Sequence, residues 1–129
     1  EKFRSQLIQK FINKNVVFFS NDAKKMSDII KDNTFSKLLA INVVYFLDPI
    51  SDYAKEFYRI LKFGGYGILS CKFEGIKNFD NIIAPNKKLN EVVETFEKVG
   101  FIVDIEFINS TNKQKEYHAI YIRKVKNGS

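Results

Sequence analysis

The chain has 129 residues, of which 45% are hydrophobic and 28% are charged. This length supports one domain with a buried core and is too short for two, so we expect residues 1–129 to form a single partial domain. Thirteen Phe and six Tyr provide large side chains for burial, which excludes a disordered chain. The apolar runs are far shorter than the roughly 20 residues of a membrane helix, and we expect no membrane contact and no secretion signal.

The formal net charge is +6, a value that raises the question of a nucleic-acid partner. The positive charges are nearly all Lys scattered along the chain, and the only arginines are Arg4, Arg59 and Arg123. Because Arg is the residue suited to bidentate contacts with phosphate and guanine, we do not expect a nucleic-acid surface. The single Cys71 cannot form an internal disulfide, which fits a reducing compartment and a cytoplasmic location.

The first part of the chain predicts one helix and two buried strands. Lys2–Asn13 has the apolar spacing of an amphipathic helix. Val16–Phe19 is a short β-branched and aromatic run that predicts a buried strand. After a polar stretch with a short helical turn expected around Met26–Ile30, the apolar run Lys37–Val43 predicts a second buried strand.

The middle of the chain predicts two helices with a strand between them. Asp48 and Pro49 have the residue types of an N-cap and a first helical position, and Phe63-Gly64-Gly65 is expected to end this helix. Its apolar stripe consists of Tyr53, Phe57, Ile60 and Leu61. Tyr66–Phe73 predicts the third strand, and Asn86–Val99 predicts the second helix.

Gly100 is expected to stop that second helix, and two strands follow, Phe101–Ile108 and Tyr117–Lys124. The polar loop between them contains no long helix, so we predict that they are antiparallel neighbours. Alternating helices and strands predict an α/β fold, with a mainly parallel sheet, helices on both faces and an antiparallel terminal hairpin.

Several stretches follow one another in the order of a known family. Val16–Phe19 is followed by the turn Ser20-Asn21-Asp22-Ala23, and Thr34–Pro49 contains an apolar strand with Asn42 near its end. The segment Arg59–Ser70 runs from the end of a helix through Gly64-Gly65 into a strand. This series resembles the carboxyl-terminal part of class I S-adenosylmethionine-dependent methyltransferases of the small-molecule type.

The resemblance has two mild departures and one serious departure. Ser36 stands where the family usually has Asp, and Phe63 where it usually has Pro. The family's Gly-x-Gly-x-Gly turn is absent, and Gly64-Gly65-x-Gly67 precedes a strand instead of linking a strand to a helix. The resemblance therefore implies a Rossmann-like methyltransferase sheet that lacks its first two strands, in a truncated or degenerate domain.

The resemblance also implies positions for S-adenosylmethionine. Asp22 matches the residue whose carboxylate accepts the adenine amino group, with the backbone of Ala23 beside it; the alternative is that Asp22 caps a turn. Asn42 and Val43 match backbone contacts with the methionine end of the cofactor, at the carboxyl end of a strand, where open α/β sheets bind ligands.

Tyr45 and Phe46 are candidates for the wall of the substrate pocket, since an aromatic face attracts the sulfonium, and helix–sheet packing is the alternative. Cys71 is expected to be a small buried residue and Lys72 a solvated one, and contact with the substrate side is the alternative for both. His118 is expected to be structural, and a base beside Tyr117 and Tyr121 is the alternative. No residue stands out as catalytic. One His and one Cys without a carboxylate cluster predict no metal site.

Two main functions remain open from the sequence, beside a third and weaker one, a basic module that binds nucleic acid nonspecifically with a steep salt dependence. The first is a methyltransferase that acts on a small-molecule acceptor. The second is a non-catalytic interaction module, because a sheet without its central strands exposes an edge that can pair with another chain. The second function predicts a homodimer or a partner subunit.

Overall fold

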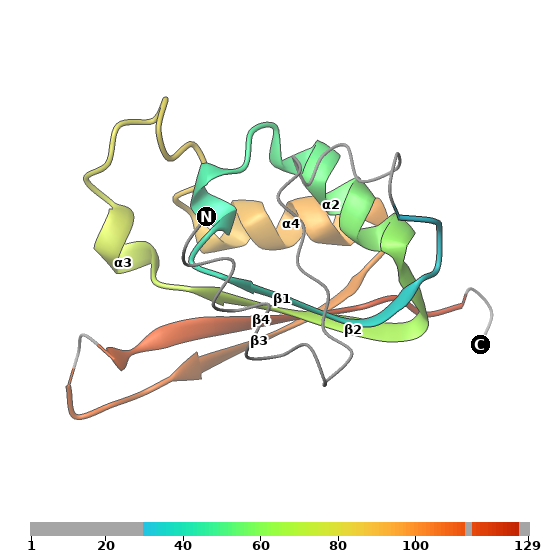
Figure 1. The fold of residues 1–129 in the computed structure, drawn as a ribbon. Coiled ribbons are helices and arrows are strands. Elements are labelled where there is room, and N and C mark those ends of the chain that lie inside the picture. Colours follow the sequence, from blue (N-terminus) through green and yellow to red (C-terminus); the bar gives the residue numbers. More distant parts are fainter. Residues whose placement is uncertain (1–29, 113–114, 127–129) are drawn as a thin grey trace, which may run out of the picture.

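The computed structural model describes residues 30–112 and 115–126. In this part of the chain, four strands form one sheet, and two long helices pack on it (Figure 1). The elements in chain order are β1 (Phe35–Ile41), the short 3-10 helix η3 (Val44–Phe46), α2 (Ile50–Ile60), β2 (Leu61–Cys71), α3 (Phe73–Ile76), α4 (Leu89–Val99), β3 (Ile102–Ile108) and β4 (Tyr117–Arg123).

Three of the expected elements fall at the amino terminus. The helix Lys2–Asn13 and the strand Val16–Phe19 lie outside the described residues, as does the turn around Met26–Ile30 apart from its last residue. These elements stay predictions.

The described sheet has the strand order β1-β2-β4-β3. β1 and β2 are parallel, whereas β4 is antiparallel to both of its neighbours, β2 and β3. The last strand therefore enters the sheet between β2 and β3, and β3 forms an edge. The mixed α/β sheet with an antiparallel closing pair confirms the expected fold class.

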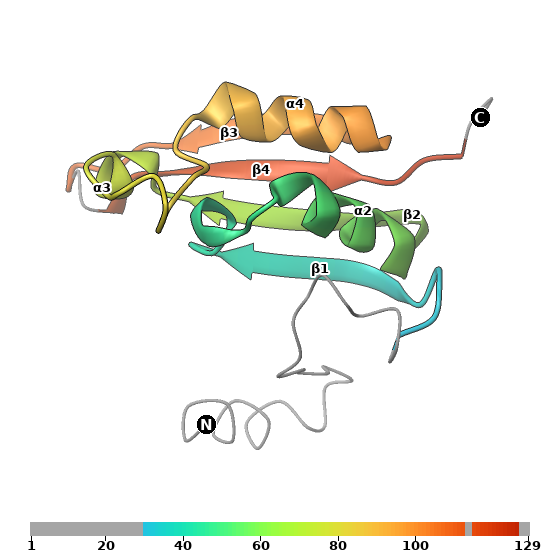
Figure 2. The same ribbon diagram turned by 90° about the horizontal axis from the view of Figure 1, so that it is seen from above.

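Both long helices cover the same face of the sheet, α2 over β1 and β2 and α4 over β3 and β4 (Figure 2). The stripe expected on α2 is buried at Phe57 and Ile60, and α4 buries Val92 and Phe96. The rings of Phe57 and Phe96 stack with their centroids 6.2 Å apart, which joins the two helices. The core therefore lies between these helices and one face of the sheet. A helix on the opposite face stays a prediction.

The expected start and end of the first described helix are wrong by a few residues. The N-cap is Pro49, without a side-chain cap from Asp48. The helix ends at Ile60, and β2 begins at once with Leu61, which is fully buried. Burial of Leu61 draws the chain into the sheet before it reaches the glycines that were expected to stop the helix.

Gly64 and Gly65 instead form an irregular start of β2. The register against β1 shifts here, from Phe35 opposite Leu61 to Lys37 opposite Tyr66. Gly64 has a φ of 88°, and a Cβ on Gly65 would lie 2.9 Å from the Lys62 carbonyl oxygen. The glycines therefore permit a bulge that lets the two strands pair, rather than a helix stop.

Other boundaries differ as well, and one helix stop is confirmed. β1 spans Phe35–Ile41 instead of Lys37–Val43, and β3 begins at Ile102 instead of Phe101. Phe73 belongs to α3 instead of the strand, Asn86 precedes α4, and Lys124 lies just beyond β4. Gly100 does end α4, with a φ of 128°. The differences at Phe73, Asn86 and Lys124 arise because each side chain makes a tertiary contact that local sequence does not encode.

Lys124 is the clearest of these contacts. The residue is 4% exposed, and its Nζ donates hydrogen bonds to Asn33 Oδ1 at 2.8 Å and to the carbonyl oxygens of Tyr58 at 2.7 Å and Leu61 at 2.9 Å. Burial lowers the pKa of Lys124. The ammonium joins the end of β4 to the junction of α2 and β2, so it fixes the helix–strand corner.

We predict that Lys124→Met destabilises the protein by about 1–3 kcal/mol, because it leaves these oxygen acceptors without their donor. Urea unfolding followed by circular dichroism measures the change. Lys126→Met is the matched control, since Lys126 is exposed and its loss changes the net charge equally. An equal loss of stability in both variants would show that charge, and not the buried contacts, is responsible.

Cys71 provides a second test of the core. The residue is completely buried, and burial raises the pKa of its thiol to about 12. Because the thiolate is the reactive form, we expect folded protein at pH 8 to react with a disulfide reagent at least about 100-fold more slowly than protein unfolded in guanidinium. Rapid reaction of the folded protein would contradict this burial. Cys71 is the only cysteine of the sequence, so the measured reaction rate belongs to this thiol alone.

Candidate functional site

The carboxyl ends of β1 and β2 lie side by side because the two strands are parallel, with Ile41 opposite Ser70. The backbone N–H of Asn42, the first residue after β1, donates to the Ser70 carbonyl oxygen at 2.8 Å. Asn42 then takes a left-handed conformation, with a φ of 55°, and turns the chain into η3. Asn tolerates this conformation better than most residues. The turn sits at the edge where open α/β sheets bind ligands.

Tyr45 joins the two strand ends. Its hydroxyl donates to Asn42 Oδ1 at 2.9 Å and accepts a hydrogen bond from the Lys72 backbone N–H, the first after β2. Tyr45 is only 2% exposed, and burial raises its pKa to about 12, so the hydroxyl keeps its proton. The orientation of Asn42 therefore depends on a buried tyrosine.

Asn86 holds the same turn from the other side, and the sequence analysis missed this role. Its side-chain amide donates to the carbonyl oxygens of Val44 at 2.8 Å and Leu47 at 2.5 Å, and its backbone N–H donates to that of Tyr45 at 3.2 Å. An Asn ahead of an amphipathic helix was interpreted as the helix start, and nothing local in the sequence indicates a partner about 40 positions away. The turn after β1 is thus fixed to the segment before α4.

The backbone at the turn has polar groups available for a ligand. Among the described residues, neither the Asn42 carbonyl nor the Val43 N–H has a hydrogen-bond partner. Val43 is 41% exposed. This arrangement fits the contacts with the methionine end of S-adenosylmethionine that the resemblance implies. The candidates for the adenine end, Asp22 and Ala23, lie outside the described residues.

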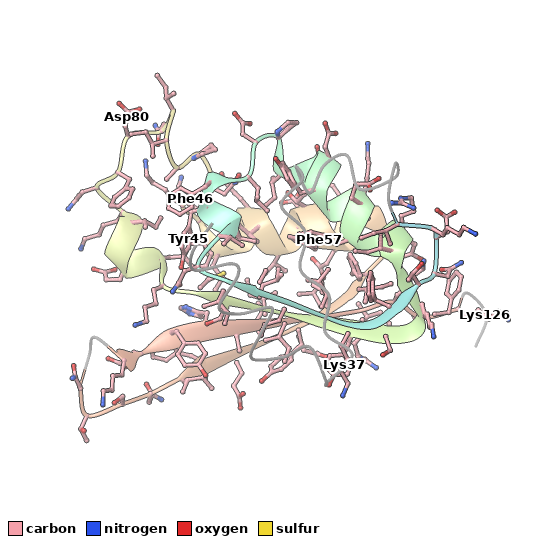
Figure 3. All side chains as sticks on the ribbon, in the orientation of Figure 1. Lys37, Tyr45, Phe46, Phe57, Asp80 and Lys126 are labelled. Carbon is pink, nitrogen blue, oxygen red and sulfur yellow. The ribbon has the colours of Figure 1, made fainter. Side chains whose placement is uncertain are left out.

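Tyr45 and Phe46 differ in their surroundings. Both rings stand on η3 over the sheet, and they meet edge to face with centroids 5.6 Å apart (Figure 3). Phe46 is 44% exposed and also approaches Phe79, whereas Tyr45 is buried. Phe46 is thus available as a pocket wall, and Tyr45 acts through its hydroxyl. The roles proposed for all these residues stay predictions.

A cavity of about 650 Å³ opens next to this turn. Its lining consists of residues 71–75, from the end of β2 into α3, together with Phe107 of β3 and residues 116–118 at the start of β4. A series of ring contacts leads into it: Tyr45 to Phe73 at 5.5 Å, Phe73 to His118 at 6.2 Å and His118 to Phe107 at 4.7 Å between centroids. The turn after β1 and the cavity therefore share an aromatic wall.

The described residues offer no metal site and no membrane span. No group of three or more His, Cys, Asp or Glu residues in this part of the chain could hold a metal ion. None of its helices is long and apolar enough to cross a membrane.

Comparison with known proteins identifies the fold. The sequence matches no protein-family model and no curated protein. A methyltransferase from Thermotoga maritima, described as S-adenosylmethionine-dependent and as a possible histamine N-methyltransferase, has a similar structure, with a TM-score of 0.64 and 22% identity. The match covers 94% of this chain and 70% of that chain.

Two further solved structures are similar. The N-methyltransferase NodS from Bradyrhizobium japonicum, solved in complex with S-adenosylhomocysteine, gives a TM-score of 0.70 at 10% identity. The [4+2]-cyclase SpnF gives 0.69 at 14% identity. Each match covers 95% of this chain and 61% of the other chain, so this chain spans less than two thirds of their length.

All three identities are low, and the likeness therefore concerns the fold. The order β1-β2-β4-β3, with its parallel part and antiparallel closing pair, is the structural basis of the match. The chain has the Rossmann-like α/β fold of S-adenosylmethionine-dependent methyltransferases, as the resemblance in sequence predicted.

Proposed function

We propose that this chain is the acceptor-side part of an S-adenosylmethionine-dependent methyltransferase domain that acts on a small molecule. The observation on which this depends is the turn after β1, where the Asn42 carbonyl and the Val43 N–H have no partner among the described residues. A solved relative of the same fold holds S-adenosylhomocysteine, which supports the choice of cofactor.

We further propose that residues 1–129 form one partial domain. The glycine-rich turn that the family places after its first strand does not occur in the sequence, and the only glycine cluster, Gly64-Gly65-x-Gly67, forms the bulge of β2. The similar solved proteins are longer than this chain. The rest of the cofactor site then comes from a segment outside these residues, or the site is degenerate.

The residues of the chain contribute binding and orientation to this function. S-adenosylmethionine, when bound, supplies the reactive methyl group, and the protein needs to position it in a dry pocket. Asn42 and Val43 contact its methionine end, Asp22 and Ala23 its adenine end, and Phe46 walls the pocket. Because the cofactor supplies the reactive group and the protein supplies binding and orientation, no catalytic residue is apparent in the sequence.

Titration calorimetry with S-adenosylhomocysteine tests the proposal. We expect detectable binding, weaker than that of a complete cofactor site, that Asn42→Gly weakens about five- to tenfold further. Glycine keeps the left-handed turn but removes the bond to Tyr45, and a hydrogen bond contributes about 1 kcal/mol.

Asn33→Gly is the matched control for this titration. Asn33 also has a left-handed conformation, with a φ of 53°, and its Oδ1 accepts a hydrogen bond from Lys124, but it precedes β1 instead of following it. We expect this variant to bind with unchanged affinity. Absence of binding by the folded wild-type chain overturns the proposal for this chain, and equal weakening in both variants overturns the role of Asn42.

The second candidate is a non-catalytic interaction module, and one observation favours it. β1 is the edge strand of the described sheet, and its Leu39 and Ile41 are 66% and 55% exposed. An apolar edge strand pairs readily with a strand of another chain.

This candidate predicts a dimer that sedimentation velocity detects and that Leu39→Lys dissociates, because a charge on an edge strand opposes pairing. Ile82→Lys, at an exposed loop position, is the control that leaves the dimer intact. A monomer at all concentrations would exclude a homodimer.

A further inference from the structure

We propose that the cavity at the end of β2 binds an organic ammonium ion with an aromatic or other apolar body. On the strength of the proposed function, this ligand is the protonated form of the methyl acceptor, and its amine becomes the nucleophile once Glu116 or His118 has accepted the proton. The cavity is lined by the end of β2, the start of α3, Phe107 and the start of β4. α3 stands beside the carboxyl end of β2, on the face of the sheet that also holds α2 and α4 (Figures 1 and 2).

The walls of the cavity suit an apolar body. Cys71, His118 and Phe107 stand opposite one another on adjacent strands, so their side chains share one face of the sheet. The rings of Phe107 and His118 lie 4.7 Å apart, and Phe73 from α3 approaches His118 at 6.2 Å. Three rings in contact form a concave apolar surface, and their faces attract a cation.

The charges of the lining favour a cation over an anion. Glu74 and Glu116 are carboxylates at the rim, and Lys72 contributes the opposite charge. Glu74 forms an ion pair with Lys77. Glu116 is partly buried and forms no ion pair within residues 30–112 and 115–126. A carboxylate without an ion-pair partner among the described residues, placed beside aromatic rings, is a complement to an ammonium group.

His118 adds a hydrogen-bond acceptor to the cavity. Its ring touches Phe73 and Phe107, but no described residue forms a hydrogen bond with its nitrogens. A neutral imidazole has one acceptor nitrogen, which suits an N–H of the ligand. The cavity therefore offers an apolar surface for the body of the ligand and two hydrogen-bond acceptors, Glu116 and His118, for its ammonium group.

The position of the cavity connects this ligand to the proposed cofactor contact. The Phe73 ring, in the cavity wall, lies 5.5 Å from the Tyr45 ring, and the Tyr45 hydroxyl holds Asn42. One side chain thus separates the two places. A methyl acceptor has to lie close to the methyl donor, and the cavity lies beside the strand ends that we propose hold this donor.

Nuclear magnetic resonance tests the cavity without cofactor. His118 is the only histidine of the chain, so its ring signals report on the site without ambiguity. The probes are 2-phenylethylammonium, neutral 2-phenylethanol and anionic phenylacetate, which share one ring and differ in charge. We expect the ammonium probe to shift the signals of His118 and Phe73 saturably at millimolar concentration. Equal or tighter binding of phenylacetate, or no saturable shift, overturns the proposal.

Two variants test whether the charge of Glu116 itself strengthens binding of the ammonium probe, or whether any loss of negative charge weakens it. We expect Glu116→Gln to weaken 2-phenylethylammonium binding about tenfold and to leave the binding of 2-phenylethanol unchanged. Glu97→Gln is the matched control, since Glu97 is exposed on α4 outside the cavity, and it should leave both unchanged. Equal weakening by both variants would falsify the role of Glu116.

The titration with S-adenosylhomocysteine distinguishes a failure of the amine-site proposal from a failure of the proposed methyltransferase function. If the ammonium probe binds and S-adenosylhomocysteine does not, the cavity is an amine site and its assignment to a methyl acceptor is wrong. If S-adenosylhomocysteine binds and the ammonium probe does not, the amine proposal alone is wrong.

Discussion

The structure depends on the parallel pairing of β1 with β2, because this pairing brings two strand ends that are about 30 residues apart in sequence to one edge of the sheet. The buried hydroxyl of Tyr45 then joins them by bonding Asn42 after β1 and the backbone of Lys72 after β2. A buried hydroxyl without partners would be costly, so the pairing of the strands and the shape of the turn stabilise each other. Asn86 adds the segment before α4 to the same unit. The turn that we propose contacts the cofactor is therefore held in place by hydrogen bonds from three segments of the chain.

The fold could be predicted from the sequence wherever one element buries its own apolar pattern. The stripes of α2 and α4 and the stop at Gly100 depend on residues three or four apart, and these were confirmed. Gly64 and Gly65 show the limit of this approach. A glycine pair after a helix suggests a stop, but here the pairing of β2 with β1 determines the conformation. Tertiary contacts override the local signal in such a case.

The candidate site was less predictable than the fold. The resemblance led to Asn42, Val43, Tyr45 and Phe46, which one turn of the chain brings together. The cavity combines residues 71–75, Phe107 and residues 116–118, and only the strand order β2-β4-β3 makes them neighbours. His118 was interpreted as structural because a histidine in a strand more often is, with a base beside Tyr117 and Tyr121 as the alternative. Its ring contacts, and the lack of a hydrogen bond to its nitrogens from any described residue, emerge only when the strands are placed.

The fold by itself does not determine the chemistry, because one scaffold can support unrelated reactions. In a cofactor-dependent enzyme the reactive group belongs to the cofactor, so the strand ends that hold it can be similar in proteins with different substrates. What distinguishes one such protein from another is the surface beyond the donor. In this chain we propose that this surface is the cavity lined in part by α3 and the start of β4, two elements for which no hydrogen bond to Asn42 is found among the described residues. Substitutions there can change the ligand while Tyr45 and Asn86 keep the turn after β1 in place, except at Phe73, whose ring packs against Tyr45 and so couples the two halves of the site.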